Sequence, residues 1–336
     1  METLSSADAA ALVERVAQGR QRILHEVRKV IVGQDDVIDL ILTALFTGGH
    51  CLITGVPGLA KTLLIKTLAA ILDLTFKRIQ FTPDLMPADI TGTEILDEAG
   101  GGRALRFVKG PIFAQIVLAD EINRTPPKTQ AALLEAMQEA HVTAAGRTYL
   151  LEPPFFVLAT QNPIELEGTY PLPEAQLDRF MFNIVMTYLP QEDEVRVAME
   201  TTGTKRPSPE RVLTGTDILE FQQAVRQVVV SEDVARYAVR IVGASRPGQP
   251  DVPEFVNRWV KWGAGLRASQ ALILGAKARA LMQSRYHVSV NDIRALAPAT
   301  LRHRIVTNFY AESEQINSDR LVERLLETVP LPRSGM

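Results

Sequence analysis

The 336-residue chain has little cysteine, few aromatic residues and almost no excess of charge. Its one cysteine, Cys51, excludes a disulfide framework within the chain and a zinc site built from several cysteines. A net charge of -3 disfavours a protein built mainly around nucleic acid or an anionic membrane. Every apolar run is well short of the roughly 20 residues of a membrane span, and the N-terminus is unlike a signal peptide. We therefore expect a cytoplasmic protein with no membrane partner.

The first half of the chain alternates short apolar segments with segments of helical periodicity. Amphipathic helices are expected over residues 8–28 and 35–46, although Arg20 interrupts the apolar face of the first. Apolar runs of strand length occur at residues 51–54, 78–81, 116–119, 155–160 and 183–186. Such runs with helices between them predict a parallel sheet covered on both faces.

The second half of the chain has no comparable run of apolar strands after Tyr188. Helices are expected near residues 191–200, 217–228, 232–245, 269–284, 290–303 and 319–327. Ser289 and Asp292 have the spacing of a capping box at one of these helix starts. The chain is thus expected to hold an α/β domain over residues 1–188 and an all-helical domain over residues 189–336.

The first chemical motif follows the apolar run 51–54 and opens a helix. Its residues are Gly55, Val56, Pro57, Gly58, Leu59, Ala60, Lys61 and Thr62, with Leu63 next in the helix. Glycines let backbone N–H groups surround phosphate oxygens at the positive end of a helix. We expect Leu63 and the residues before it to bind nucleotide, with Lys61 reaching the phosphates and Thr62 holding Mg²⁺.

One residue of this motif departs from the general phosphate-loop pattern, in which a glycine precedes the lysine. Ala60 stands at that position, and its Cβ is expected to be tolerated only if its φ is negative. A glycine-rich turn with a surface lysine is the alternative interpretation of the octapeptide.

Polar residues also end two of the later apolar runs. Asp120 ends one of them, where it can hold the water shell of Mg²⁺, and Glu121 can polarise an attacking water. Asn162 follows another run and could fix that water, although an ordinary turn before Pro163 is the simpler reading of this segment alone. Together with the phosphate loop, these residues indicate a nucleotide hydrolase.

The combined motifs resemble the AAA+ ATPases, and most closely their MoxR family. The segment Gly55–Thr62 is similar to the family's phosphate loop, in which alanine at position 60 is ordinary. The resemblance implies a P-loop NTPase core with a five-stranded parallel sheet, of order 5-1-4-3-2, plus an all-helical lid domain. It also implies ATP and Mg²⁺ as the ligands.

Further residue roles come only from this resemblance. Gly33 and Gln34 match the turn that contacts adenine, and Asn162 matches the family's sensor 1. Arg179 falls in the segment of the arginine finger, and Arg267 on the sensor 2 arginine, where Gly265 and Leu266 replace the family's Ser and Pro. The resemblance implies that Arg267 reaches the phosphates from the lid.

Two positions in the core are assigned more loosely by the same comparison. Arg124 is a second candidate for an arginine that acts on the neighbouring subunit, because it follows the segment of Asp120 and Glu121. Gln80 falls near the position of the family's glutamate switch.

The resemblance also bears on assembly and partners. Segments 94–110 and 140–153 are expected to form hairpins, turning near Gly100–Gly102 and near Ala145–Gly146. In related proteins such hairpins face the centre of a ring. An ATP-hydrolysing homo-oligomeric ring, a hexamer, is therefore expected to remodel a protein client, which in this family is often a von Willebrand factor A domain protein. A nucleic-acid motor, disfavoured by the charge, and an ATP-regulated scaffold are the alternatives.

Overall fold

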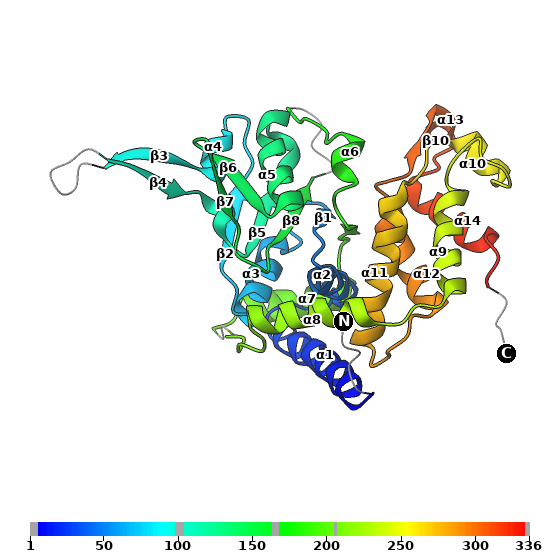
Figure 1. Ribbon diagram of the computed structural model, residues 1–336, viewed down its shortest axis with the longest axis horizontal. Coiled ribbons are helices and arrows are strands. Elements are labelled where there is room, and N and C mark those ends of the chain that lie inside the picture. The colour runs from blue at the N-terminus through cyan, green and yellow to red at the C-terminus, as the bar shows by residue number, and fades with distance from the viewer. Residues whose placement is uncertain (1–5, 98–103, 163–167, 205–206, 333–336) are drawn as a thin grey trace.

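The computed structural model describes residues 6–97, 104–162, 168–204 and 207–332. A sheet with its covering helices forms one part, a group of helices forms the other, and a long hairpin projects from the sheet side (Figure 1). None of the helices in these described ranges is long and apolar enough to cross a membrane.

Five parallel strands form the central sheet. Their order across the sheet is β2-β5-β8-β1-β9. Numbered along the chain and read from the β9 edge, this order is 5-1-4-3-2, so the predicted topology is confirmed. The bounds are β1 Cys51–Thr54, β2 Phe76–Gln80, β5 Ile116–Asp120, β8 Phe156–Gln161 and β9 Phe182–Val185.

Alternate residues of the strands build two separate cores, one on each face of the sheet. Ile53, Leu118 and Ile184 pack on the side of α1 (Ser6–Val27), α2 (Asp35–Thr47) and α3 (Lys61–Ile71). Leu52 and Val117 pack on the other side, against α4 (Pro87–Thr91) and α5 (Pro127–Glu139). Cys51 is buried at the start of β1, and burial raises the pKa of its thiol. The apolar runs are continuous because both faces of the sheet are covered.

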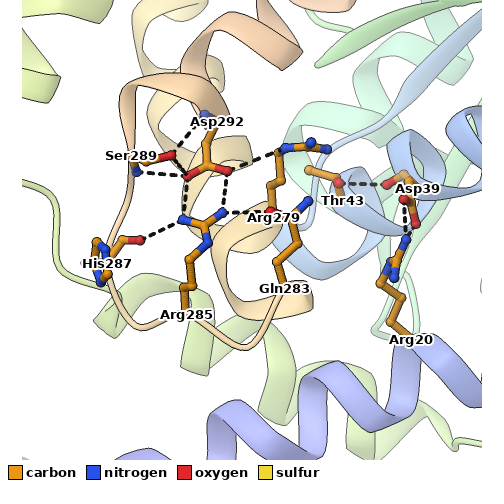
Figure 2. Close-up of polar contacts among 9 residues, drawn as sticks. All are labelled: Arg20, Asp39, Thr43, Arg279, Gln283, Arg285, His287, Ser289 and Asp292. Atoms are coloured by element: carbon orange, nitrogen blue, oxygen red, sulfur yellow. Dashed lines mark hydrogen bonds and ion pairs between the residues drawn. The ribbon is translucent and has the colours of Figure 1, made fainter.

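The arginine that interrupts the apolar face of α1 has a partner on the next helix. Arg20 donates from Nε to Asp39 Oδ1 at 2.7 Å, and Figure 2 shows this pair between α1 and α2. The ion pair lets a polar residue occupy a half-buried position, and it joins the two helices.

Two antiparallel hairpins extend from the core. One pairs β3 (Gly92–Asp97) with β4 (Ala104–Lys109), and the turn expected near Gly100–Gly102 lies outside the described residues. The other pairs β6 (His141–Ala144) with β7 (Arg147–Leu150), and it turns at Ala145 and Gly146 as expected. The rings of Phe107 and Tyr149 stack at 4.1 Å between centroids and join the two hairpins.

Where the structure describes it, the lid is helical, as expected, apart from one short ladder and an isolated bridge between Val229 and His287. Strands β10 (Val260–Trp262) and β11 (Val306–Thr307) pair antiparallel, so the expectation of an all-helical domain is wrong in this detail. The helices after the sheet are α7 Gln191–Thr201, α8 Gly215–Gln227, α9 Glu232–Ala244, α10 Glu254–Trp259, α11 Leu266–Met282, α12 Val290–Leu301, α13 Phe309–Ser313 and α14 Ser318–Thr328. Helix α8 packs against α1 and α2. Helices α9 to α14 form the second group (Figure 1), which joins the first where α11 packs against α1 and α2. Shorter elements are α6 (Glu174–Leu177) and single 3₁₀ turns at Pro111–Phe113 and Ile122–Arg124.

A buried carboxylate organises the turn between α11 and α12. Asp292 accepts two hydrogen bonds from Arg285, at 2.7 and 2.8 Å, and one from the Ser289 backbone, at 2.8 Å (Figure 2). Burial alone would raise the pKa of Asp292, but the bonds from Arg285 and Ser289 outweigh it and hold the pKa below its ordinary value. The expected capping box is therefore present, and the same carboxylate fixes the start of α12.

Candidate functional site

The carboxyl ends of three neighbouring strands gather most of the predicted site residues. Strands β5, β8 and β1 lie side by side and parallel, so the residues that follow them meet at one edge of the sheet. This edge carries the loop after β1, Asp120 and Glu121 at the end of β5, and Asn162 directly after β8. Asn162 is buried there, with 6% of its surface exposed.

The loop after β1 has the features of an anion-binding turn. Gly58 has φ 89° and open space where a side chain would stand, and α3 begins at Lys61 with Thr62 in its first turn. Lys61 Nζ donates to the carbonyl oxygens of Gly55 and Val56, at 2.6 and 3.3 Å. Burial lowers the pKa of Lys61, while the charges of Asp120 and Glu121 oppose the shift. The ammonium group is thus held over the loop and faces both carboxylates.

Ala60 does not have the negative φ that we expected. Its φ and ψ are 56° and 24°, the left-handed conformation, at the residue that precedes α3. A left-handed conformation costs a non-glycine residue roughly 1–2 kcal/mol, and the tight entry into α3 imposes it. Ala60 therefore adopts the same left-handed conformation that glycine would adopt at this position, and the alanine side chain adds conformational strain.

Asp120 is fixed by two partners that the sequence did not reveal. Thr160 Oγ1 donates to Asp120 Oδ1 at 2.6 Å, and Arg78 Nε donates to Oδ2 at 2.9 Å. Thr160 also accepts a bond from the backbone N–H of Glu121 at 2.9 Å. The sequence does contain one indication for Arg78. It lies two residues before Gln80 in a strand, so both side chains lie on one face of β2, beside β5.

Glu121 has a left-handed backbone and two side-chain donors. Its φ is 58°, which turns its carboxylate away from the line of β5. Gln80 Nε2 donates to Glu121 Oε2 at 2.9 Å, and Arg124 donates to the same oxygen at 3.0 Å. The residue assigned loosely from the resemblance, Gln80, thus contacts the candidate catalytic carboxylate. Arg124 is paired within its own chain.

A cavity of about 690 Å³ adjoins the phosphate loop. Its lining comes from the segment before α2, the loop, and α7. Gln34 lies in it with φ 62°, its Nε2 donating to the Leu59 carbonyl at 3.5 Å and its buried Oε1 unpaired within the described chain. Gly33 has φ 68°, and a side chain there would press on Leu189. Gln34 and the phosphate loop therefore share one cavity, and Gly33 lies next to it in the chain.

Several lining residues were missed by the sequence reading. Tyr188, Val197 and Thr201, which follow β9 or belong to α7, contribute to the cavity. Leu63, which was expected to bind nucleotide, lines the cavity from α3. The hydrophobic periodicity of α7 predicts a helix but does not indicate a binding surface, because the side that lines the cavity is no more apolar than an ordinary packed helix face.

Arg179 and Arg267 lie near the amino ends of the strands, on the side of the sheet opposite the phosphate loop. Arg179 donates to the Leu134 carbonyl of α5 at 3.2 Å. The segment that follows it begins β9, and the Met181 N–H bonds the carbonyl of His50, immediately before β1. Arg267, at the start of α11, faces Asp178 at 3.9 Å. The implied approach of Arg267 to the phosphates of its own chain is absent from this arrangement, which groups it with the Arg179 segment instead.

The gathered residues fit a nucleoside triphosphate with Mg²⁺. The loop and helix start suit phosphate, the cavity has room for a base, and the unpaired Gln34 oxygen can accept from one. Within the described residues, no group of three or more His, Cys, Asp or Glu could hold a metal by itself. Thr62 and Asp120 would therefore share the ion with phosphate oxygens, as Mg²⁺ sites commonly do.

Comparisons with known proteins agree with this geometry. Residues 50–182 match the model of the ATPase family associated with various cellular activities (AAA), and residues 256–325 match the AAA lid domain. Chaperone MoxR1 of Mycobacterium tuberculosis is 43% identical over 93% of this chain and 82% of its own length. YeaC of Bacillus subtilis is 42% identical over 93% of this chain and 94% of its own length.

A solved structure shares the whole arrangement. The crystal structure of a Cytophaga hutchinsonii protein superposes with a TM-score of 0.90 at 42% identity, covering 97% of this chain and 99% of that one. Nucleotide use and ATP hydrolysis are general properties of the matched AAA family. With its phosphate loop, its paired carboxylates and its helical lid, the chain belongs to the MoxR family of AAA+ ATPases.

Proposed function

We propose that this chain hydrolyses ATP to ADP and phosphate within a homo-oligomeric ring, a hexamer, and uses the turnover to remodel a protein partner. One observation carries the hydrolysis: Lys61, Asp120 and Glu121 converge at a single sheet edge beside a cavity large enough for a nucleotide. Phosphoryl transfer needs charge neutralisation and positioning, and this edge supplies both.

Each residue at this edge has one task in the proposed reaction. Lys61 leaves its loop carbonyls to meet the β- and γ-phosphates. Mg²⁺, held by Thr62 and by Asp120 through water, would neutralise phosphate charge. Glu121 orients and polarises the attacking water, and Asn162 holds that water toward the γ-phosphate. The Gln80 bond holds the Glu121 carboxylate toward the end of the neighbouring strand β2.

Arg179 and Arg267 would act on the next subunit. Strands of four to six residues separate the two ends of the sheet by roughly 15 Å, so neither arginine reaches the phosphate loop of its own chain. Both stand on one surface, where a neighbour's nucleotide could meet them. An arginine finger that a partner protein inserts into the active site increases the hydrolysis rate of related GTPases by about 10³–10⁵. Activity would then depend on assembly.

The remaining parts are assigned by the same proposal. The proposed boundary between core and lid lies between residues 188 and 189, with the hinge beside Leu189 in the cavity wall. Helix α8 then belongs to the lid by its place in the chain, although it packs against α1 and α2 of the core. The two hairpins face the client, and a von Willebrand factor A domain protein is the partner class that the resemblance suggests. The cytoplasm is the proposed location.

Nucleotide binding by a lysine variant tests the assignment. Lys61→Ala should lose ATP binding, measured by calorimetry, because the ammonium group that lies over the loop is removed. Lys66→Ala is the matched control, since Lys66 lies exposed on the same helix α3. Unchanged ATP affinity in Lys61→Ala would remove the phosphate-loop assignment.

A further inference from the structure

The turn after α12 binds the backbone of the segment that follows α6. Arg304 is 7% exposed in this turn. Its guanidinium donates to the carbonyl oxygens of Asp178, Phe180 and Met181, at 3.0, 2.7 and 3.1 Å. It also donates to Asp178 Oδ1 at 2.7 Å and to the Thr300 carbonyl at 2.5 Å. All five N–H groups of the guanidinium therefore have acceptors.

Two neighbouring residues of the same turn reinforce this contact. His303 Nε2 bonds the Phe180 carbonyl at 3.1 Å, and Arg302 donates to the Asn183 carbonyl at 2.9 Å. Arg302 and His303 were expected to belong to the helix, which instead ends at Leu301. Ending the helix there frees three consecutive side chains to reach across to the core.

The bonded carbonyls lie on both sides of Arg179. Arg304 holds the carbonyl before it and the carbonyl after it, so one planar group fixes the backbone at that residue. The ion pair of Asp178 with Arg304 also places Asp178 near Arg267 of α11. A buried ion pair alone is weak support for stability. Four of the Arg304 donors are directed at one short segment, and together they specify its geometry.

We propose that Arg304 is a positioning residue for Arg179. It makes the lid and the arginine presented to the next subunit move as one unit, so that lid position controls the chemistry of the neighbour. The inference rests on the proposed function, because it takes Arg179 to act on the adjacent subunit.

Mixed rings separate this role from a structural one. Arg304→Lys keeps the charge but has three donors and no planar fork. Alone, it should keep ATP affinity within about threefold and lose at least about tenfold in turnover. Mixed equally with Lys61→Ala subunits, it should recover about one quarter of wild-type turnover, because Lys61→Ala subunits still donate an intact Arg179. Mixed with Arg179→Ala subunits, it should recover nothing, since both variants fail as donors.

A matched control comes from another buried lid arginine. Arg285 bonds Gln283, the His287 carbonyl and Asp292, which all belong to the lid (Figure 2). Arg285→Lys should restore turnover when mixed with Arg179→Ala subunits, because its own Arg179 stays positioned. Recovery of Arg304→Lys with Arg179→Ala, but not with Lys61→Ala, would overturn the proposal and place Arg304 in its own subunit's reaction. Wild-type turnover of Arg304→Lys alone would also overturn it.

Two further measurements keep the outcome decisive. If Arg304→Lys does not fold, Asp178→Asn weakens the same contact and should show the same mixing pattern, and wild-type turnover in Asp178→Asn would refute the role. If Lys61→Ala and Arg179→Ala subunits fail to restore each other's ATP turnover, the proposed action of Arg179 between subunits is wrong.

Amide hydrogen exchange then tests the positioning role of Arg304 independently of that action. The Met181 N–H should exchange at least about tenfold faster in Arg304→Lys than in wild type. An unchanged rate would overturn the positioning role by itself.

Discussion

His50 gives a prediction whose size can be worked from the structure. It precedes β1, and its buried imidazole accepts from the Val157 N–H at Nδ1, 3.0 Å away. Nε2 therefore carries the proton and bonds the Met137 carbonyl at 3.0 Å. Burial lowers the pKa of His50 to about 4, although the Met137 carbonyl opposes the shift. The neutral ring joins β8 to α5 across the start of β1.

The sign of the pH effect follows from this lowered pKa. Below about pH 6.5 the unfolded chain protonates His50, while the folded chain resists protonation until about pH 4. The free energy of unfolding contributed by His50 is therefore complete above about pH 6.5 and falls as the pH drops toward 4. Between about pH 7.5 and pH 5 the loss comes to roughly 2 kcal/mol.

Urea unfolding at several pH values measures this contribution. His50→Gln should be less stable than wild type at pH 7.5, but its stability should fall by about 2 kcal/mol less on going to pH 5. His303 is also buried with a lowered pKa, and it stays in both proteins, so its effect cancels in the difference. His287→Gln removes an exposed imidazole and serves as the control. Parallel pH curves for wild type and His50→Gln would refute the reasoning.

Two other changes test local features of the fold. Ala60→Gly should raise the free energy of unfolding by about 0.5 kcal/mol, because relief of the left-handed strain slightly exceeds the added entropy of the unfolded chain; urea unfolding measures it, and a loss of stability would contradict the strain at this position. Replacing Phe107 and Tyr149 by alanine, singly and together, should give a coupling energy of about 0.5–1.5 kcal/mol in a double-mutant cycle, and additive losses would show that the stack does not join the hairpins.

The sheet and its site were predictable because local signals and topology agree there. β1 has the expected bounds, since a short, mostly apolar run lies between Gly49 and a glycine-rich loop. Parallel strands place their following residues at one edge, so Lys61, Asp120 and Asn162 converge without any long-range information. The conformation of Ala60 could not be read, because the helix entry, and not the residue type, sets its φ.

Contacts between segments that are distant in the chain could not be predicted from the sequence. β10 and β11 have three and two residues and lie far apart in the chain, so neither carries a measurable alternation. The partners of Asp120 depend on register between β2 and β5, which places Arg78 within reach of it. The location of Arg267 depends on how α11 packs beside α6, which its motif does not encode.

The central claim is that Glu121 activates water for ATP hydrolysis at this sheet edge, and phosphate release from Glu121→Gln tests it most directly. Glutamine keeps an oxygen that can accept from Gln80 and Arg124, so the fold and ATP affinity should be retained. Turnover at saturating ATP and Mg²⁺ should fall by about 10²–10⁴, the range for a lost general base, while Glu135→Gln on the exposed side of α5 stays as wild type. Tight ATP binding with almost no phosphate release is the predicted result, and wild-type phosphate release from Glu121→Gln would contradict the account.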